Sequence, residues 1–308
     1  MGKIAFLFAG QGSQYPGMAK DLYETEESVR TLFDRAEEIR PGTLRLMFSG
    51  SEEELKQTDN TQPCLFLADL AAATALRSHG IRPDAAAGFS LGEIAGLAEA
   101  GILSGDDAFR LVCKRGARMQ KAAEATKGSM IAVLRMEQTA LEEVCRTHGV
   151  YPVNYNCPGQ IVVSGECERM DLLKKDLTAR GARFAELSVG GAFHTPYMKE
   201  AAKGLRNDIE AFSVGEARIP LYANRTARPY ETKRETILDT VCEQICNPVR
   251  FEETLRNMAE AGVDTFVECG PGKTLSGFVK RTVKDAKIYA VSDMESLLAA
   301  AEELGGMR

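Results

Sequence analysis

The sequence predicts an α/β protein whose main part is a mostly parallel sheet, with a second, smaller part inserted into the chain. Three observations support this prediction. Short apolar runs alternate with helical patterns along most of the 308 residues, which is typical of a parallel sheet covered by helices on both faces. A G-x-S-x-G pentapeptide, residues 88–92, stands between one apolar run and one helical pattern. Residues 126–190 then change to a rhythm of strand, helix, two strands, helix and strand.

The main part is predicted from the segments before and after that change. Residues 4–9 form an apolar run that ends in a glycine-containing loop at 10–14, so we expect a buried strand that leads into a loop. The other elements expected before the insertion are helices at 25–39, 52–57, 62–77, 93–100 and 106–124, and a strand at 85–89. After it we expect helices at 195–212, 233–246, 251–261 and 273–283, strands at 219–223, 264–268 and 287–291, and a C-terminal helix.

The inserted part has the element order of a ferredoxin-like subdomain. Its expected strands are 129–135, 151–156, 160–164 and 183–189, and its expected helices are 137–147 and 166–180. We therefore predict a large catalytic domain formed by residues 1–125 and 191–308, and a small ferredoxin-like subdomain at 126–190.

Composition and charge exclude several function classes. The net charge of -6 and the pI near 5.4 argue against general nucleic-acid binding. No segment is long and apolar enough to span a membrane, and the N-terminus lacks the pattern of a signal peptide. The eight cysteines form no C-x-x-C pair and have no histidines at ligand spacing. We expect reduced cysteines that pack in the core of a cytoplasmic protein, and no metal site.

Ser90 is the candidate nucleophile. Its pentapeptide has the strand–turn–helix context that lifts one hydroxyl above a sheet edge, and the two glycines allow a strained backbone there. The alternative is a tight turn with an ordinary serine. An oxyanion hole would use the amide of Leu91 and an amide from a neighbouring loop, for which Gln11 is the best candidate.

His194 is the candidate general base. The chain has three histidines, and His79 and His148 each precede a glycine at the end of a predicted helix, which is a capping position. His194 lies in a loop between the two predicted domains, where ligand sites are common. The order of serine before histidine fits an α/β-hydrolase-like core. No third member of a triad is apparent, so either an acid elsewhere or a backbone carbonyl must orient the imidazole.

Arg115 lies on the apolar stripe of the helix predicted at 106–124. A guanidinium held against apolar surface keeps its charge and needs an anionic partner. That partner is either a buried acid of the protein or the carboxylate of a substrate, which arginine can bind through two hydrogen bonds.

Several motifs occur in the order found in one known family. They are F-A-G-Q-G-S-Q at 8–14, T-Q-P at 61–63, G-F-S-L-G-E at 88–93, R-G at 115–116 with M-Q at 119–120, N-Y-N-C-P-G-Q at 154–160, G-A-F-H at 191–194, N-P-V-R at 247–250 and E-C-G-P-G-K at 268–273. Together they resemble the malonyl-CoA:acyl-carrier-protein transacylases, within the acyltransferase family of fatty-acid and polyketide synthesis. The resemblance runs from residue 4 to about 293.

The resemblance implies roles for individual residues. It implies a Ser90–His194 dyad in which a backbone carbonyl near Arg250 orients the histidine, and an oxyanion hole formed by the amides of Gln11 and Leu91. It places the malonyl carboxylate on Arg115 and adds Met119, Asn156 and Phe193 to the substrate site, Phe193 being typical of malonyl-selective members. One departure is Phe89, where many members have histidine.

The implied activity is malonyl transfer from malonyl-CoA to the phosphopantetheine thiol of acyl carrier protein, by a ping-pong mechanism through a malonyl-serine, in fatty-acid biosynthesis. We expect no cofactor, because the CoA thioester is itself a substrate, and we expect a monomer. The alternatives are a stand-alone acyltransferase of a polyketide synthase, a serine thioesterase on the same core, and a catalytically silent binding module. A basic patch for carrier docking would come from Lys280, Arg281, Lys284 and Lys287, or from Lys114 and Arg118, although either set could equally be a solvated helix face.

Overall fold

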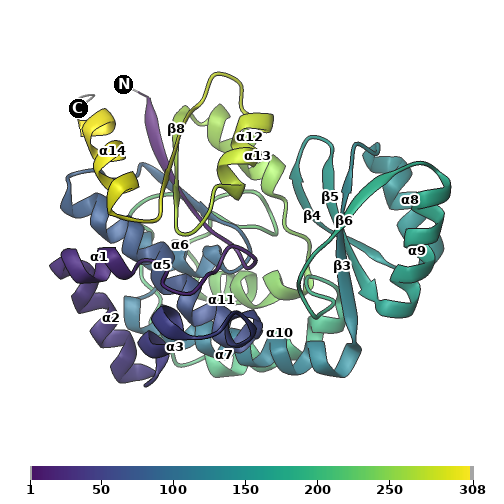
Figure 1. The fold of residues 1–308 in the computed structure, drawn as a ribbon, viewed down its shortest axis with the longest axis horizontal. Helices are drawn as coiled ribbons and strands as arrows, with labels where there is room; N and C mark the ends of the chain where they lie inside the picture. The colour runs from purple at the N-terminus through teal and green to yellow at the C-terminus, as the bar shows by residue number, and fades with distance from the viewer. Residues whose placement is uncertain (1, 306–308) are drawn as a thin grey trace.

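The computed structural model describes residues 2–305 and contains two separate sheets (Figure 1). One is a five-stranded parallel sheet with helices packed on both faces. The other is a four-stranded antiparallel sheet that lies to one side of it. The predicted α/β class, with a mostly parallel sheet and a small ferredoxin-like part, is confirmed.

The elements have the following bounds. The strands are β1 (Lys3–Phe8), β2 (Ala85–Gly88), β3 (Gly128–Leu134), β4 (Tyr151–Cys157), β5 (Gln160–Glu166), β6 (Arg183–Glu186), β7 (Leu221–Tyr222), β8 (Val263–Cys269) and β9 (Lys287–Val291). The α-helices are α1 (Lys20–Thr25), α2 (Glu27–Ile39), α3 (Thr43–Ser49), α4 (Glu52–Lys56), α5 (Thr58–Ser78), α6 (Gly92–Glu99), α7 (Gly105–Thr126), α8 (Gln138–His148), α9 (Cys167–Ala179), α10 (Lys199–Asp208), α11 (Arg234–Glu243), α12 (Phe251–Glu260), α13 (Thr274–Thr282) and α14 (Met294–Gly305). Two 3₁₀ turns are η1 (Pro196–Met198) and η2 (Gln244–Cys246).

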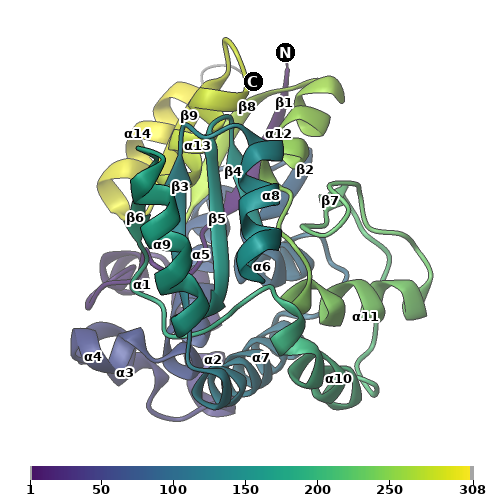
Figure 2. The ribbon, with the colours of Figure 1, turned by 90° about the vertical axis from the view of Figure 1, so that its right-hand side faces the viewer.

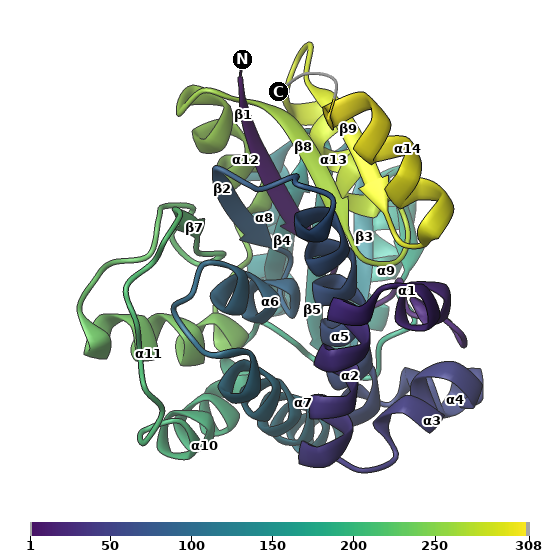
Figure 3. The same cartoon turned by 90° about the vertical axis from the view of Figure 1, so that its left-hand side faces the viewer.

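The parallel sheet has the strand order β7-β2-β1-β8-β9 (Figure 3). Phe8 at the end of β1 is in register with Gly88 at the end of β2 and with Cys269 at the end of β8. The loops that follow these three strands therefore meet at one edge of the sheet. This is the edge where ligand sites of open α/β sheets are found.

Side chains of β1 alternate between the two faces of the sheet, as the two-residue period of a strand requires. Phe6 and Phe8 are fully buried in the core that includes helices α5, α6 and α7. Ala5 and Leu7 are fully buried on the other face, against α12 and α13. Burial on both faces explains why the strands read as continuous apolar runs.

The small sheet has the order β4-β5-β3-β6, and α8 and α9 cover its outer face (Figure 2). Ile131 and Val133 of β3 pack against these two helices. Met130 and Ala132, which alternate with them, face the parallel-sheet part. The elements of this sheet run from Gly128 to Glu186, and the domain boundaries at 126 and 190 stay a prediction.

Several local expectations were wrong. From the sequence, no separate helix was predicted at α1 and none at α3. Helix α5 begins four residues earlier than expected. The helix predicted at 195–212 is a 3₁₀ turn followed by the shorter α10, and the strand predicted at 183–189 ends at Glu186. The helix predicted at 233–246 tightens into η2 in its last turn, which frees backbone carbonyls that an α-helix would use internally.

The cysteines are all unpaired, and five of them are buried. Cys113 and Cys246 are half-buried, whereas Cys167 is exposed, so the expectation that all eight pack in the core was wrong for Cys167. Among residues 2–305, no helix has both the length and the apolar composition needed to cross a membrane.

Candidate active site

Ser90 lies in a sharp turn between β2 and α6. Its φ of 53° is in the left-handed region, which L-residues rarely adopt. A Cβ at Gly88 would lie 1.9 Å from the carbonyl carbon of Gly92, and a Cβ at Gly92 would lie 2.2 Å from the Phe8 oxygen. Both glycines are therefore required by close backbone approach. The turn has the geometry of a nucleophile elbow.

His194 contacts the serine directly. The distance between Ser90 Oγ and His194 Nε2 is 2.8 Å. His194 Nδ1 lies 3.0 Å from the carbonyl oxygen of Gln244 and 3.1 Å from that of Asn247. A carbonyl accepts only, so Nδ1 carries the proton and Nε2 is left as the acceptor toward the serine hydroxyl. The other two histidines, at helix ends, contact Glu26 and Asp176 instead.

The orienting group is a backbone carbonyl, but not the one predicted at Arg250. The Arg250 carbonyl accepts from the Thr254 amide at 2.9 Å, and among the described residues no hydrogen bond joins it to His194. The carbonyls of Gln244 and Asn247 face His194 because η2 ends the helix at this point. The sequence left open whether an acid or a backbone carbonyl orients the imidazole, and the structure has backbone carbonyls there.

Burial and the positive charge of Arg115 lower the pKa of His194 to about 4. The imidazole is therefore neutral at pH 7 and can accept a proton. The two carbonyls act in the opposite direction, because they favour the imidazolium.

Arg115 of α7 is fully buried beside the serine. Its Nη2 lies 3.1 Å from Ser90 Oγ and 2.7 Å from Gln244 Oε1, and its Nη1 lies 2.8 Å from Gln62 Oε1. Its Nε has no hydrogen-bond partner among the described residues. Burial lowers the pKa of Arg115 to about 10, so the guanidinium is charged at neutral pH, and the negative charge of Glu93 acts in the opposite direction. The hydrogen-bond partners of this cation are all neutral.

Two residues that the sequence did not single out hold the elbow in place. Asn224 Oδ1 accepts from the Ser90 amide at 2.7 Å, and Asn224 Nδ2 donates to the Gly88 carbonyl at 2.6 Å. Gln244 Nε2 donates to the Ser90 carbonyl at 2.7 Å. Asn224 carries no sequence signal, since it follows a two-residue strand. The sequence also did not single out Gln62 as a partner of Arg115, although Gln62 belongs to the T-Q-P motif.

The amide of Ser90 is occupied by Asn224, so it is not free to bind an oxyanion. The amide of Leu91, at the start of α6, donates to no residue in any hydrogen bond found within 2–305. The same holds for the amide of Gln11, whose side chain donates to Thr58 Oγ1 at 3.4 Å. Gln11 lies in the loop after β1, at the sheet edge where β2 also ends. Roles for these two amides stay a prediction.

Ser90 and His194 line a cavity of about 270 Å³ between the two sheets. Met119, Asn156 and Phe193 also line it, as the resemblance implied. Further lining residues are Gln11 and Phe89 from the large part and Met130, Ala132, Asn154 and Val162 from the small sheet. The side-chain oxygens of Asn154 and Asn156 are buried without partners. The cavity is therefore mostly apolar with a few free polar acceptors.

Phe89 belongs to an aromatic cluster at this cavity. Its ring centroid lies 5.3 Å from that of Phe251 and 5.9 Å from that of Phe278. The ring packs against apolar neighbours, which explains why an apolar residue is accepted at this position.

The basic residues considered for partner docking differ in their surroundings. Arg118 and Lys114 both pair with Asp208. Arg281 contacts Gln160 at 3.3 Å.

Among the described residues, no group of three or more histidine, cysteine or acidic side chains is arranged to hold a metal ion.

Comparison with known proteins places this geometry in a family. The model of the acyl transferase domain family matches residues 5–301. A malonyl CoA-acyl carrier protein transacylase from Bacillus subtilis (strain 168) is 42% identical over 311 residues, which cover 99% of this chain and 98% of that relative.

Solved structures agree. Malonyl CoA-acyl carrier protein transacylase from Clostridium perfringens has a TM-score of 0.94 and 35% identity, covering 99% of this chain and 98% of that one. A malonyl-transacylase in complex with a holo type II polyketide synthase acyl-carrier protein has a TM-score of 0.93 and 35% identity, covering 98% and 99% of the two chains. The serine elbow, its histidine and the buried arginine thus lie in a chain that belongs to the acyl transferase domain family.

Proposed function

We propose that this protein transfers malonyl groups from malonyl-CoA to the phosphopantetheine thiol of acyl carrier protein. The observation that carries the proposal is the 3.1 Å distance between Arg115 Nη2 and Ser90 Oγ. A buried guanidinium with neutral partners lies beside a nucleophile, where it can bind the free carboxylate of an acyl group attached to that serine. The activity named for the relatives is the same.

In the first half-reaction, His194 Nε2 takes the proton of Ser90 Oγ while the oxygen attacks the thioester carbonyl of malonyl-CoA. The tetrahedral oxyanion is bound by the amides of Leu91 and Gln11, each contributing about 3 kcal/mol. The carbon–sulfur bond then breaks, and the CoA thiolate leaves with the proton from His194. The product is a malonyl ester of Ser90.

In the second half-reaction, His194 takes the proton of the carrier's phosphopantetheine thiol. The thiolate attacks the ester carbonyl, and Ser90 leaves and recovers its proton from His194. Because the carrier thiol uses the same site as CoA, the two substrates alternate in a ping-pong order. The carbonyls of Gln244 and Asn247 keep the imidazole in the required tautomer through both halves.

Selectivity for malonyl follows from the charge of Arg115. A malonyl carboxylate gives the guanidinium a charged partner in a buried site, whereas an acetyl group gives it none. The apolar wall with Phe193 and Met119 limits the space around the acyl chain. This part of the site also distinguishes a transferase from a general esterase, for which Arg115 would have no role.

Two kinds of carrier protein are candidate acceptors, one of fatty-acid synthesis and one of polyketide synthesis. The relatives' names give malonyl transfer to an acyl carrier protein without naming a pathway, while one structural neighbour was solved with a type II polyketide synthase acyl-carrier protein. We propose the fatty-acid carrier as the substrate and expect a cytoplasmic monomer that needs no metal or cofactor.

The test is the intact mass of the protein after brief exposure to malonyl-CoA without carrier. We expect a gain of one malonyl group, no gain in Ser90→Ala, and a much weaker gain with acetyl-CoA. Addition of holo-carrier should remove the group and malonylate the carrier. Steady CoA release without an adduct would instead indicate a thioesterase, and neither adduct nor release would indicate a binding module.

A further inference from the structure

Glu93 is a buried carboxylate in the first turn of α6, three residues after Ser90. It accepts from the Asn224 amide at 2.7 Å, from the Tyr230 hydroxyl, and from Gln244 Nε2 at 3.2 Å. Two of these three groups can only donate, and the Tyr230 hydroxyl donates readily, so together they fit an ionised carboxylate. Burial raises the pKa of Glu93, while these hydrogen bonds and the charge of Arg115 act in the opposite direction.

Glu93 is linked to Arg115 through the side-chain amide of Gln244. The amide nitrogen donates to Glu93, and the amide oxygen accepts from Arg115 Nη2 at 2.7 Å. The two charges are thus separated by one neutral amide and attract each other without contact. The orientation of the amide is fixed, because its nitrogen also donates to the Ser90 carbonyl.

In the absence of substrate, the negative charge of Glu93 compensates the positive charge of Arg115. A malonyl carboxylate that reaches Arg115 is a second negative charge near a cation that already has one counter-charge. Charges in a buried site are poorly screened, so Glu93 and the malonyl carboxylate repel each other.

We propose that Glu93 is a specificity-setting residue that weakens the hold of Arg115 on the malonyl carboxylate and so limits the stability of the malonyl-serine. The inference rests on the proposed function, because it requires that Arg115 binds the malonyl group. It explains how a site that selects a charged acyl group can also release it. An arginine without a counter-charge would retain the malonyl ester and slow its transfer to the carrier.

The test is the exchange equilibrium between enzyme, acyl-CoA, acyl-enzyme and free CoA, measured by intact mass. Glu93→Gln keeps the shape of the side chain: its oxygen can accept from Asn224 and Gln244, and its NH₂ can donate to the Tyr230 hydroxyl. We expect this variant to shift the malonyl-enzyme equilibrium toward the ester roughly tenfold, because it removes one poorly screened negative charge near the malonyl carboxylate. The acetyl-enzyme equilibrium should not change.

The matched control is Glu99→Gln. Glu99 is a buried carboxylate on the same helix that pairs with Arg77, outside the cavity. It should leave both equilibria unchanged. Glu93→Asp retains the charge and should return the malonyl equilibrium toward that of the original protein.

Two results would overturn the proposal: an unchanged malonyl equilibrium in Glu93→Gln, or an equal change for both acyl groups, which would indicate an effect on the serine elbow. If Glu93→Gln does not fold, Tyr230→Phe serves instead. It removes one donor from the carboxylate, favours its neutral form, and should give a smaller shift in the same direction; no shift there would equally contradict the proposal. A failure of the proposed function is distinct, since the unaltered protein would then form no malonyl adduct.

Discussion

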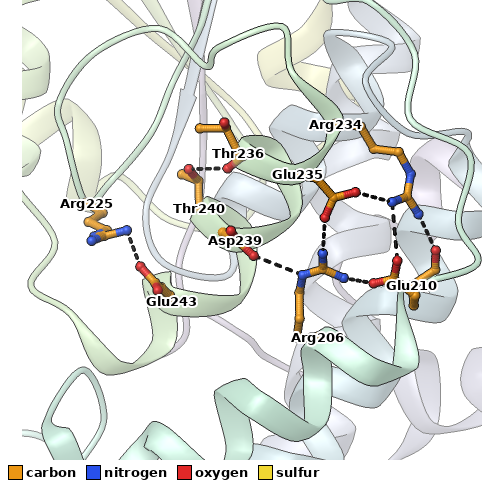
Figure 4. A network of polar contacts seen from close by, with 9 residues as sticks. All are labelled: Arg206, Glu210, Arg225, Arg234, Glu235, Thr236, Asp239, Thr240 and Glu243. Carbon is orange, nitrogen blue, oxygen red and sulfur yellow. Dashed lines mark hydrogen bonds and ion pairs between the residues drawn. The ribbon is translucent and has the colours of Figure 1, made fainter.

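Two arginine networks in this molecule use the same chemical groups in opposite ways. Arg115 is fully buried and its hydrogen bonds end on neutral side chains, with the carboxylate of Glu93 one amide away. Arg206 of α10 lies near the surface, and its side-chain hydrogen bonds within the described residues all end on carboxylates (Figure 4). The first cation is left able to receive another carboxylate, whereas the second is saturated.

The exposed network joins α10 to α11 (Figure 4). Arg206 Nε lies 3.0 Å from Asp239 and Nη2 lies 2.5 Å from Glu235, while Nη1 contacts Glu210. Arg234 adds a bond to Glu235 at 2.8 Å. These carboxylates are more than half exposed, so water competes for each ion pair.

The difference shows what burial does to an arginine. On the surface, ion pairs form freely and each contributes about 0–1 kcal/mol to stability. In the interior, an arginine that lacks a direct carboxylate costs free energy, which the fold must offset elsewhere. Such a site persists where function requires it. The following predictions test this contrast, beginning with the largest expected effect.

Ser90→Ala should abolish malonyl-enzyme formation, and His194→Ala should reduce transfer by at least about 10³-fold, because the base is lost. The measurement is malonylation of holo-carrier in a coupled or mass-based assay. Both variants should still bind malonyl-CoA. Substantial transfer by Ser90→Ala would show that the nucleophile lies elsewhere.

Arg115→Ala should lose the preference for malonyl over acetyl by roughly 10²-fold while some acetyl transfer remains, since the paired charge contributes only with malonyl. The measurement is the ratio of kcat/KM for the two acyl-CoA substrates. Arg206→Ala is the control and should keep the original ratio. Unchanged selectivity in Arg115→Ala would contradict the carboxylate-binding role.

Asn224→Ala should lower the free energy of unfolding by about 2–3 kcal/mol, because the buried amide of Ser90 and the carbonyl of Gly88 lose their partners. Because the elbow is then less fixed, kcat should fall more than KM rises. Thermal unfolding and steady-state kinetics measure the two effects. Stability similar to the original protein would mean that water replaces the lost contacts.

The acidic limb of the kcat/KM profile should lie near the lowered pKa of His194, about 4, with activity rising as pH increases through it. Arg115→Gln removes one of the two causes of this lowering, so the limb should move to higher pH. The comparison uses acetyl-CoA, which both proteins can process. A limb that stays in place would mean that the charge of Arg115 does not reach the imidazole.

Arg206→Ala should have the smallest effect: a loss of at most about 1 kcal/mol in stability, reduced further by salt, with no change in transfer. Chemical denaturation at low and high ionic strength measures it. A loss well above about 1 kcal/mol would contradict the weak contribution expected of exposed ion pairs.

The sequence predicted the elements and residues that carry local signals. The elbow at Ser90 follows from two glycines and a strand–helix pattern, and Arg115 was recognised because a charge stood on an apolar stripe. Asn224 and Gln244 carry no such signal, since an amide in a loop or at a helix end looks the same whether it bonds to water or to the nucleophile's backbone. The carbonyls that orient His194 belong to the backbone, so no side chain marks them.

The edge of the small sheet also has a mechanical consequence. β4 is bonded to the segment after η2, through the Tyr155 amide to the Val249 carbonyl at 2.9 Å and the Val249 amide to the Val153 carbonyl at 2.8 Å. The same strand carries Asn156 in the cavity wall, and Asn247, two residues before Val249, orients His194. A displacement of the small sheet is therefore expected to move the cavity wall at Asn156 and the carbonyl that orients His194 together. The space for the acyl group and the orientation of the imidazole would then change at the same time.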